Sequence, residues 1–164
     1  MIRQFSPPGG QTIFCDDIRQ EVNGKLTLVG VYGPQMIILG SFPISIPVLN
    51  ALIYLRVGSE QGNKACVVRV IREAETDEIL AEFKLDIPEL DIAFQQAQRG
   101  KEDSVVSFAE MRIPVRLSLL TFKEHCRLKV RAYIEDDEIR LGVLDVVIGA
   151  IESASGDAGV PSPL

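Results

Sequence analysis

The side chains best suited to nucleophilic chemistry are three thiols and one imidazole. They are Cys15, Cys66, Cys126 and His125. A cysteine nucleophile needs the imidazole within hydrogen-bond reach of its sulfur. His125 and Cys126 are neighbours, and neighbours in an extended segment point to opposite faces, so these two are not expected to pair. His125 could pair with Cys15 or Cys66 in a cysteine-dependent hydrolase, but we favour buried thiols and a turn histidine.

Two acidic clusters supply oxygen ligands or paired carboxylates. Asp16 and Asp17 are weak metal candidates, because calcium sites use several converging carboxylates and the D-x-D spacing is missing here. We expect them to bond turn backbone instead. The run E-D-D-E at 135–138 is predicted to form an exposed hairpin tip. Such a tip cannot raise a carboxyl pKa as paired-carboxylate hydrolysis requires. No phosphate-binding or nucleophile-elbow motif occurs, so we predict no cofactor, no metal and no catalytic residue.

Five cations form the most informative surface pattern. Arg112 and Arg116 alternate along one expected strand, and Arg127, Lys129 and Arg131 alternate along another. Residues two apart share a face of a strand, so the cations within each set lie together. One interpretation is an ordinary sheet face with cross-strand ion pairs, which is the commoner arrangement. The other is a partner-binding face for an acidic protein surface or tail.

Alternating apolar residues predict the strands that carry these groups. The segment from Thr12 to Tyr32 reads as two strands around the tight-turn signal Asn23-Gly24, and we expect its second half, from Lys25 to Tyr32, to be a central strand. Further strands are predicted at 50–57, 65–72, 79–85, 111–120, 127–134 and 139–148. Pro43 and Pro47 confine the segment around them to an edge or crossover. The side chains expected to face inward include Ala51, Ile53, Leu55, Val57, Cys66, Val68, Val70, Ile79, Ala81, Phe83, Leu85, Ile113, Val115, Leu117, Leu119, Leu128, Val130, Ala132 and Ile134.

The apolar spacing changes once along the chain. Leu90, Ala93, Phe94 and Ala97 recur three and four residues apart, and Gly100 follows. This spacing predicts a short helix over 89–98. Many short strands with one helical insert indicate a mainly β chain folded as a two-sheet antiparallel sandwich.

Length and composition favour one domain with flexible ends. The chain has 164 residues, 46% of them hydrophobic and 24% charged. We predict a flexible N-terminus over 1–11, a sandwich domain over 12–150 and a disordered tail over 151–164. A net charge of −6 argues against nucleic acid as a partner. The apolar runs are too short to span a membrane and no signal peptide is evident, so we expect a cytoplasmic location.

Two segments resemble known families. The segment C-D-D-I-R-Q-E-V-N-G-K-L-T-L-V-G-V-Y, from Cys15 to Tyr32, resembles the opening motif C-D-D-[IV]-R-x-E-x-x-G-K-x-x-L-x-G-V-Y of an uncharacterised bacterial family. That resemblance implies no assigned activity, ligand or partner. The segment from Phe122 to Ile139 is similar to the penultimate hairpin of immunoglobulin-like and C2-like sandwiches, which implies a fold of that kind.

These observations favour a non-catalytic module over an enzyme. The preferred function is a protein-interaction or self-assembling β-sandwich that binds either another protein with an acidic surface or a second copy of itself as a homodimer. The first alternative is a small-molecule or carbohydrate-binding sandwich. The chain has only three Tyr and no Trp, and Tyr133 is the Tyr expected to point outward. The second alternative is the cysteine-dependent hydrolase.

Overall fold

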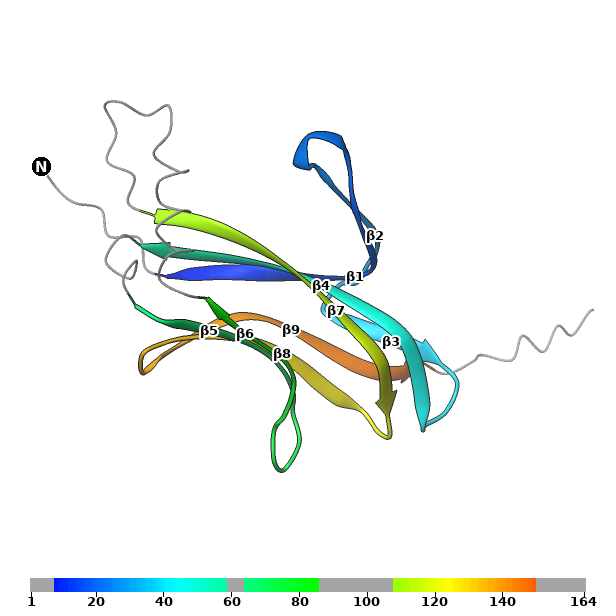
Figure 1. The fold of residues 1–164 in the computed structure, drawn as a ribbon. Coiled ribbons are helices and arrows are strands. Elements are labelled where there is room, and N and C mark those ends of the chain that lie inside the picture. Colours follow the sequence, from blue (N-terminus) through cyan, green and yellow to red (C-terminus); the bar gives the residue numbers. More distant parts are fainter. Residues whose placement is uncertain (1–7, 59–63, 86–107, 150–164) are drawn as a thin grey trace, which may run out of the picture.

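The molecule consists of two facing β-sheets (Figure 1). The computed structural model describes residues 8–58, 64–85 and 108–149. A four-stranded sheet has the order β2-β1-β4-β7, and a five-stranded sheet has the order β3-β9-β8-β5-β6. The bounds are β1 Gly9–Gln20, β2 Leu26–Val31, β3 Gln35–Leu39, β4 Ile44–Gly58, β5 Cys66–Arg72, β6 Glu78–Leu85, β7 Phe108–Phe122, β8 Cys126–Ile134 and β9 Asp137–Gly149. The mainly β, two-sheet prediction is therefore confirmed, while the helix predicted over 89–98 and the tail over 151–164 lie outside the described residues.

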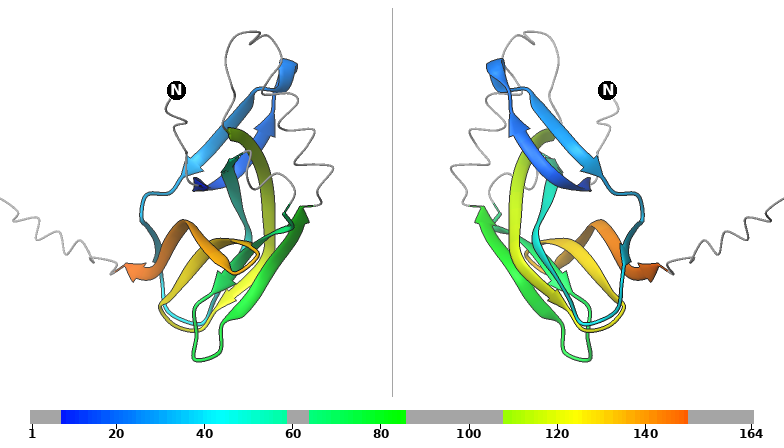
Figure 2. Two further views of the ribbon diagram at one scale, coloured as in Figure 1. Left: turned by 90° about the vertical axis from the view of Figure 1, so that its left-hand side faces the viewer. Right: turned by 90° about the vertical axis from the view of Figure 1, so that its right-hand side faces the viewer.

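The core fills the space between the two sheets, as the alternation predicts. The inward sets of β4, β5 and β8 all belong to one cluster of buried side chains, whose largest fully buried members include Phe122, Leu49, Ile53, Leu55 and Leu128. Figure 2 shows the layers from both sides, with the sheets stacked but not closed into a barrel. Burial of aliphatic and Phe side chains is the main force that holds the layers together, at roughly 25 cal/mol per Å² of apolar surface.

Three features of the sheets correct the sequence predictions. The strand expected to be central, β2, is instead an edge strand that pairs only with β1. The pairing of β3 with β9 is parallel, so the sandwich is not wholly antiparallel. Strand β1 begins at Gly9, which is paired with Arg56, so ordered pairing starts inside the segment predicted to be flexible.

Two side chains predicted to face inward are exposed instead. Leu119 is 82% exposed and has a φ of 56°, and Leu120 takes its place in the core. Ile79 is 50% exposed, because a bulge between Val70 and Ile71 turns its neighbour Leu80 toward the core. In β7 the side chains after the irregular residue, and in β6 the side chain before it, therefore lie on the other face of the sheet from the one that strict alternation predicts.

The second half of β1 and all of β2 form a hairpin arm, which we define as residues 16–31. Beyond Cys15, strand β1 leaves β4 and pairs with β2 alone. The arm rises from the four-stranded sheet, away from the two layers (Figure 1). Its turn contains Asn23 and Gly24 with φ of 65° and 72°, which confirms the tight reversal predicted there.

Candidate functional site

The five predicted cations do not lie on one surface. Arg112 and Arg116 lie on β7 in the four-stranded sheet, whereas Arg127, Lys129 and Arg131 lie on β8 in the five-stranded sheet. Alternation along a strand shows which residues share its face but not which sheet the strand joins. The structure thus splits the expected stripe into two unrelated sets.

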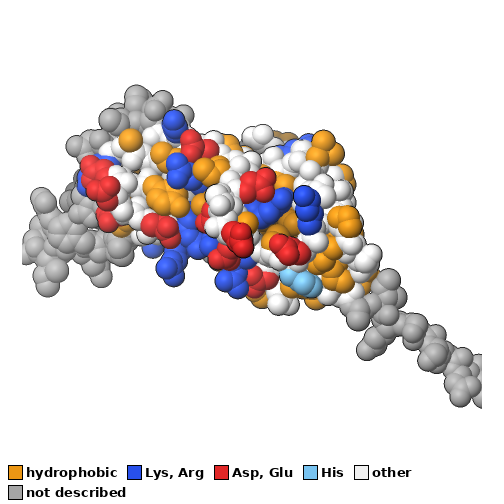
Figure 3. All heavy atoms as spheres, turned by 90° about the horizontal axis from the view of Figure 1, so that it is seen from below, with side chains coloured by type: hydrophobic (Ala, Val, Ile, Leu, Met, Phe, Trp, Pro, Cys, Tyr) orange, Lys and Arg blue, Asp and Glu red, His pale blue; other side chains and the backbone are white. Residues whose placement is uncertain are grey.

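The three cations of β8 are matched by acids on the neighbouring strand β9 and in the turn that follows β5. Arg127 Nε lies 2.7 Å from Asp145 Oδ1, and Lys129 Nζ lies 2.6 Å from Glu73 Oε1. Arg131 is only 9% exposed and lies 3.2 Å from Glu138. The hydrogen bond to Asp145 raises the pKa of the Arg127 guanidinium. Acidic and basic side chains therefore alternate over the outer face of the five-stranded sheet (Figure 3), as the ion-pair interpretation expects.

The other two cations have no such partners among the residues whose placement is described. In the described part of the chain, neither Arg112 nor Arg116 has an acidic oxygen within ion-pair distance, and both are exposed. Unpaired exposed cations remain available to a ligand, because no intramolecular acid has to be displaced first. Of the five predicted residues, these two are the ones whose charge stays uncompensated.

Arg116 lines a groove between the two sheets at their shared open side. The groove has a volume of about 620 Å³ and runs between residues 78–83 of β6 and 114–121 of β7. Both are edge strands within the described part of the chain, where β6 pairs only with β5 and β7 only with β4. Its apolar surface includes Leu80, Phe83, Val115, Leu117 and Leu120. Two rows of unpaired strand backbone therefore border one partly apolar groove.

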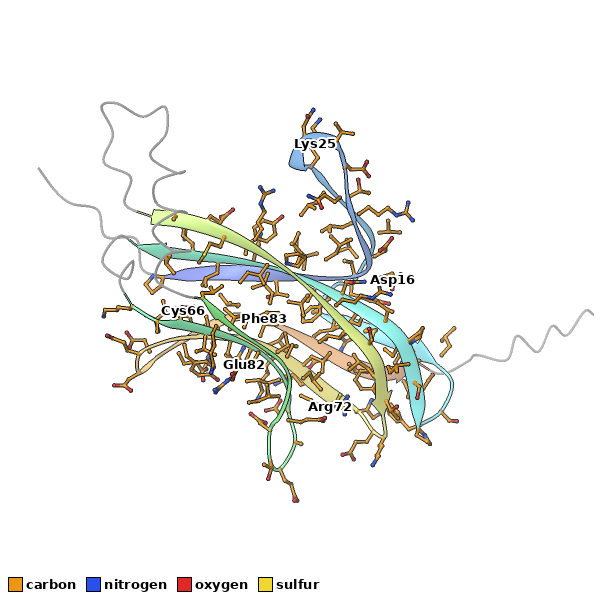
Figure 4. The ribbon with its side chains drawn as sticks, in the orientation of Figure 1. Asp16, Lys25, Cys66, Arg72, Glu82 and Phe83 are labelled. Atoms are coloured by element: carbon orange, nitrogen blue, oxygen red, sulfur yellow. The ribbon has the colours of Figure 1, made fainter. Side chains whose placement is uncertain are left out.

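The polar side chains of this groove are mainly cationic. Arg72, Arg116 and Lys123 line it together with one acid, Glu78, which bonds Arg72 at 3.0 Å. The guanidinium of Arg72 also lies 5.2 Å from the centre of the Phe122 ring, and its Nε is buried without a hydrogen-bond partner among the described residues. A buried donor of this kind is costly until an acceptor reaches it. Arg72 and Phe83 extend from the neighbouring strands β5 and β6 (Figure 4).

The thiols and the histidine do not form a catalytic pair in this arrangement. Burial raises the pKa of Cys15 and Cys126, and it raises that of Cys66 to about 11. The ring of His125 packs edge-on against Phe42 at 5.1 Å between centroids. No hydrogen bond joins a cysteine to His125 within the residues that the structure describes. The thiols are therefore held in the protonated, weakly nucleophilic form at neutral pH.

Asp16 and Asp17 hold the base of the arm. The Tyr32 hydroxyl donates to Asp16 Oδ1, and Asn50 Nδ2 donates to the Asp16 carbonyl at 2.7 Å. Asp17 accepts a bond from Arg19 at 2.9 Å. Residues 8–58, 64–85 and 108–149 contain no group of three metal-binding side chains. Asp16 therefore bonds residues next to the arm, and Asp17 bonds Arg19 within it. Sequence reasoning missed Asn50 and Tyr32, which lie far from Asp16 along the chain.

The aromatic side chain predicted to point outward is already engaged. Tyr133 is half-buried, and the guanidinium of Arg69 lies 5.1 Å from its ring centre. A carbohydrate platform needs a free aromatic face, and this ring is partly covered. The ring of Tyr133 therefore does not present a free face to a sugar.

The fold and this open groove define a two-sheet β-sandwich with an apolar, cation-lined edge. Over residues 11–147 the sequence matches the model of DUF6941, a family of unknown function, and the chain belongs to that family. The match includes the whole opening motif from Cys15 to Tyr32. A comparison with curated proteins found no match. In the described ranges, no helix has the length and hydropathy needed to traverse a bilayer.

Proposed function

We propose that the protein is a non-catalytic interaction module that binds an extended, acidic segment of another protein along the groove between β6 and β7. The observation that carries this proposal is a pair of strand edges that face one groove and that no other described strand covers. An extended peptide adds to such an edge through main-chain hydrogen bonds, and pockets for alternate side chains select its sequence.

The charge of the groove specifies the partner. The three lining cations outnumber the single acid, although the whole chain carries a charge of −6. An added strand would turn every second side chain toward Leu80 and Phe83 and the others toward Arg116. The partner segment therefore alternates apolar and acidic residues.

Further parts of this proposal rest on other observations. The absence of catalysis is supported by the raised pKa values of the thiols. A cytoplasmic location is supported by three cysteines that are all free thiols. An immunoglobulin-like or C2-like arrangement is supported by the chain's crossings between two facing sheets, for example from β4 to β5 and from β6 to β7.

The binding test uses a blocked eight-residue peptide that alternates valine and glutamate, with the valine–glutamine peptide as its control. We expect the acidic peptide to shift backbone amide resonances of residues 78–83 and 114–121 and to slow their exchange. The double variant Arg116→Glu, Lys123→Glu should weaken binding by at least about tenfold, because two attractive charges become repulsive.

A matched variant controls for charge alone. Arg112 lies on the same strand, is exposed and does not line the groove, so Arg112→Glu should leave the affinity nearly unchanged. Resonance shifts outside the groove, or equal losses in Arg112→Glu and Arg116→Glu, would show that the groove is not the binding site. Saturable binding of a monosaccharide at residues around Tyr133 would favour the carbohydrate alternative instead.

A further inference from the structure

The hairpin arm has one edge that is protected against pairing and one that is not. Along the β1 edge, residues 16–21 read D-D-I-R-Q-E, whereas residues 26–31 of β2 read L-T-L-V-G-V. Charged residues are a common means of preventing edge strands from pairing with another chain, and proline is another. Strand β2 has neither from Leu26 to Val31, and its Val29 and Val31 are 38% and 57% exposed.

The remaining free edges differ from β2. The edge of β7 contains Pro114, the edge of β6 contains Glu82 and Lys84, and β3 has only five residues. The arm is also only two strands wide, and a two-stranded hairpin is marginally stable in water without a further strand or layer against it. Among the described strands, β2 is thus the edge with the least protection and with the greatest need of a partner.

We infer that two copies of the chain pair through antiparallel β2 strands, with the two-fold axis passing close to Thr27. This pairing would join the four-stranded sheets of the two copies into one continuous sheet. In this register Thr27 faces Thr27 of the second copy, and Leu26 faces its Leu28. Both are favourable cross-strand pairs, the first through hydroxyl hydrogen bonds and the second through apolar contact.

Charge complementarity supports the second copy as the occupant. Antiparallel pairing places the tip of one arm beside the base of the other, and Figure 4 shows Lys25 at the tip and Asp16 at the base. With the axis at Thr27, Lys25 lies opposite Val29 of the other copy, and Val29 is paired with Asp17 on β1. A lysine side chain can reach that carboxylate across one strand. The same contact occurs twice, once on each side of the axis.

The test is sedimentation velocity of the full chain from about 1 µM to several hundred µM. We expect a reversible monomer–dimer equilibrium and slower amide exchange of residues 26–29 in the dimer. The variant Thr27→Lys places two ammonium groups across the axis and should raise the dissociation constant by at least about tenfold. Gln20→Lys adds the same charge to the exposed β1 edge of the arm and should leave dimerisation nearly unchanged.

A charge exchange tests the register. Lys25→Glu should weaken the dimer, and adding Asp17→Lys to it should restore much of the lost affinity. A chain that stays monomeric over the whole concentration range would overturn the inference, as would equal effects of Thr27→Lys and Gln20→Lys. Circular dichroism of each variant shows whether the sandwich is intact. The peptide-binding groove lies on β6 and β7, so peptide binding by Thr27→Lys separates this inference from the proposed function.

Discussion

Asp16 connects the segment from Cys15 to Tyr32 to the shape of the arm. Its carboxylate accepts a hydrogen bond from the Tyr32 hydroxyl, and its backbone carbonyl accepts one from the side-chain amide of Asn50 on β4. Gly30 has a φ of 63°, and a Cβ there would overlap the Asp16 carboxylate. Three residues of the opening motif, Asp16, Gly30 and Tyr32, therefore serve one purpose, which is to fix the arm where it leaves the sandwich.

Tyr32 should titrate far later than a free tyrosine. Burial and the neighbouring Asp16 raise its pKa to about 12 from an ordinary value of 10.0. Because the folded-state pKa is raised, the neutral phenol stabilises the fold fully below pH 10, and this contribution is lost as the pH rises through 12. Absorbance titration near 295 nm should therefore show a tyrosine ionisation step near pH 12 in the native protein.

The variant Tyr32→Phe tests whether Tyr32 is the residue that ionises near pH 12. It should remove the ionisation step near pH 12. The variant should also be less stable by about 1 kcal/mol at neutral pH, since Asp16 loses a hydrogen bond. A late step that survives in Tyr32→Phe would show that the bond to Asp16 does not form in solution.

In both β4 and β7, the face of the strand that points to the core changes at one place, near Pro47 and Leu119. Upstream of Pro47 the residues of β4 that pack against the core are Ile44 and Ile46, and downstream the first members of the core cluster are Leu49 and Ala51. Leu119 lies beside this point on β7, because Ile46 pairs with Leu120 and Val48 with Ser118. Pro47 lies beyond the part of β4 that pairs with β1, so its missing N–H costs no ladder bond there, as the edge prediction required.

Replacing Leu119 tests the irregular backbone of β7. The φ of 56° is unfavourable for any residue with a Cβ, and at 82% exposure little packing is lost on truncation. Leu119→Gly should therefore be more stable than Leu119→Ala by about 1 kcal/mol in urea unfolding. In a regular strand the alanine variant would be the more stable of the two, because glycine in a strand interior weakens the strand. An alanine variant as stable as the glycine variant would contradict the left-handed conformation.

The sequence predicted the strands well and their positions poorly. Alternation placed Ala51, Val68 and Val130 in the core because packing between sheets demands a period of two. The exposure of Leu119 and Ile79 could not be predicted, because a single bulge or positive φ reverses the faces without changing composition. The uncharged run of β2 suggests a central strand, but apolar character indicates pairing strength and not position in the sheet, and β2 lies at the edge.

Whole-molecule electrostatics separate the two groups of predicted cations. The cations of β8 are neutralised by acids that the folded sheet brings beside them. The order of strands in the sheet decides these neighbours, and a local sequence pattern carries no information about that order. Arg116 has no acidic partner within 8–58, 64–85 and 108–149, and it lines the groove together with Arg72 and Lys123. The acidic chain therefore has one groove with a local excess of positive charge, which attracts acids that the rest of the surface repels.

This distribution predicts a salt-dependent affinity for the alternating valine–glutamate peptide. Screening shortens the reach of exposed charges from about 10 Å at 0.1 M salt to about 3 Å at 1 M. Calorimetric titration should therefore show weaker binding as sodium chloride rises from about 0.05 to 0.5 M. The valine–glutamine peptide should bind weakly at every salt concentration, because main-chain pairing and apolar contact change little with salt. If the two peptides lost affinity in parallel, or if Arg116→Glu, Lys123→Glu kept the salt dependence of the native chain, the groove cations would not be the source of the selectivity.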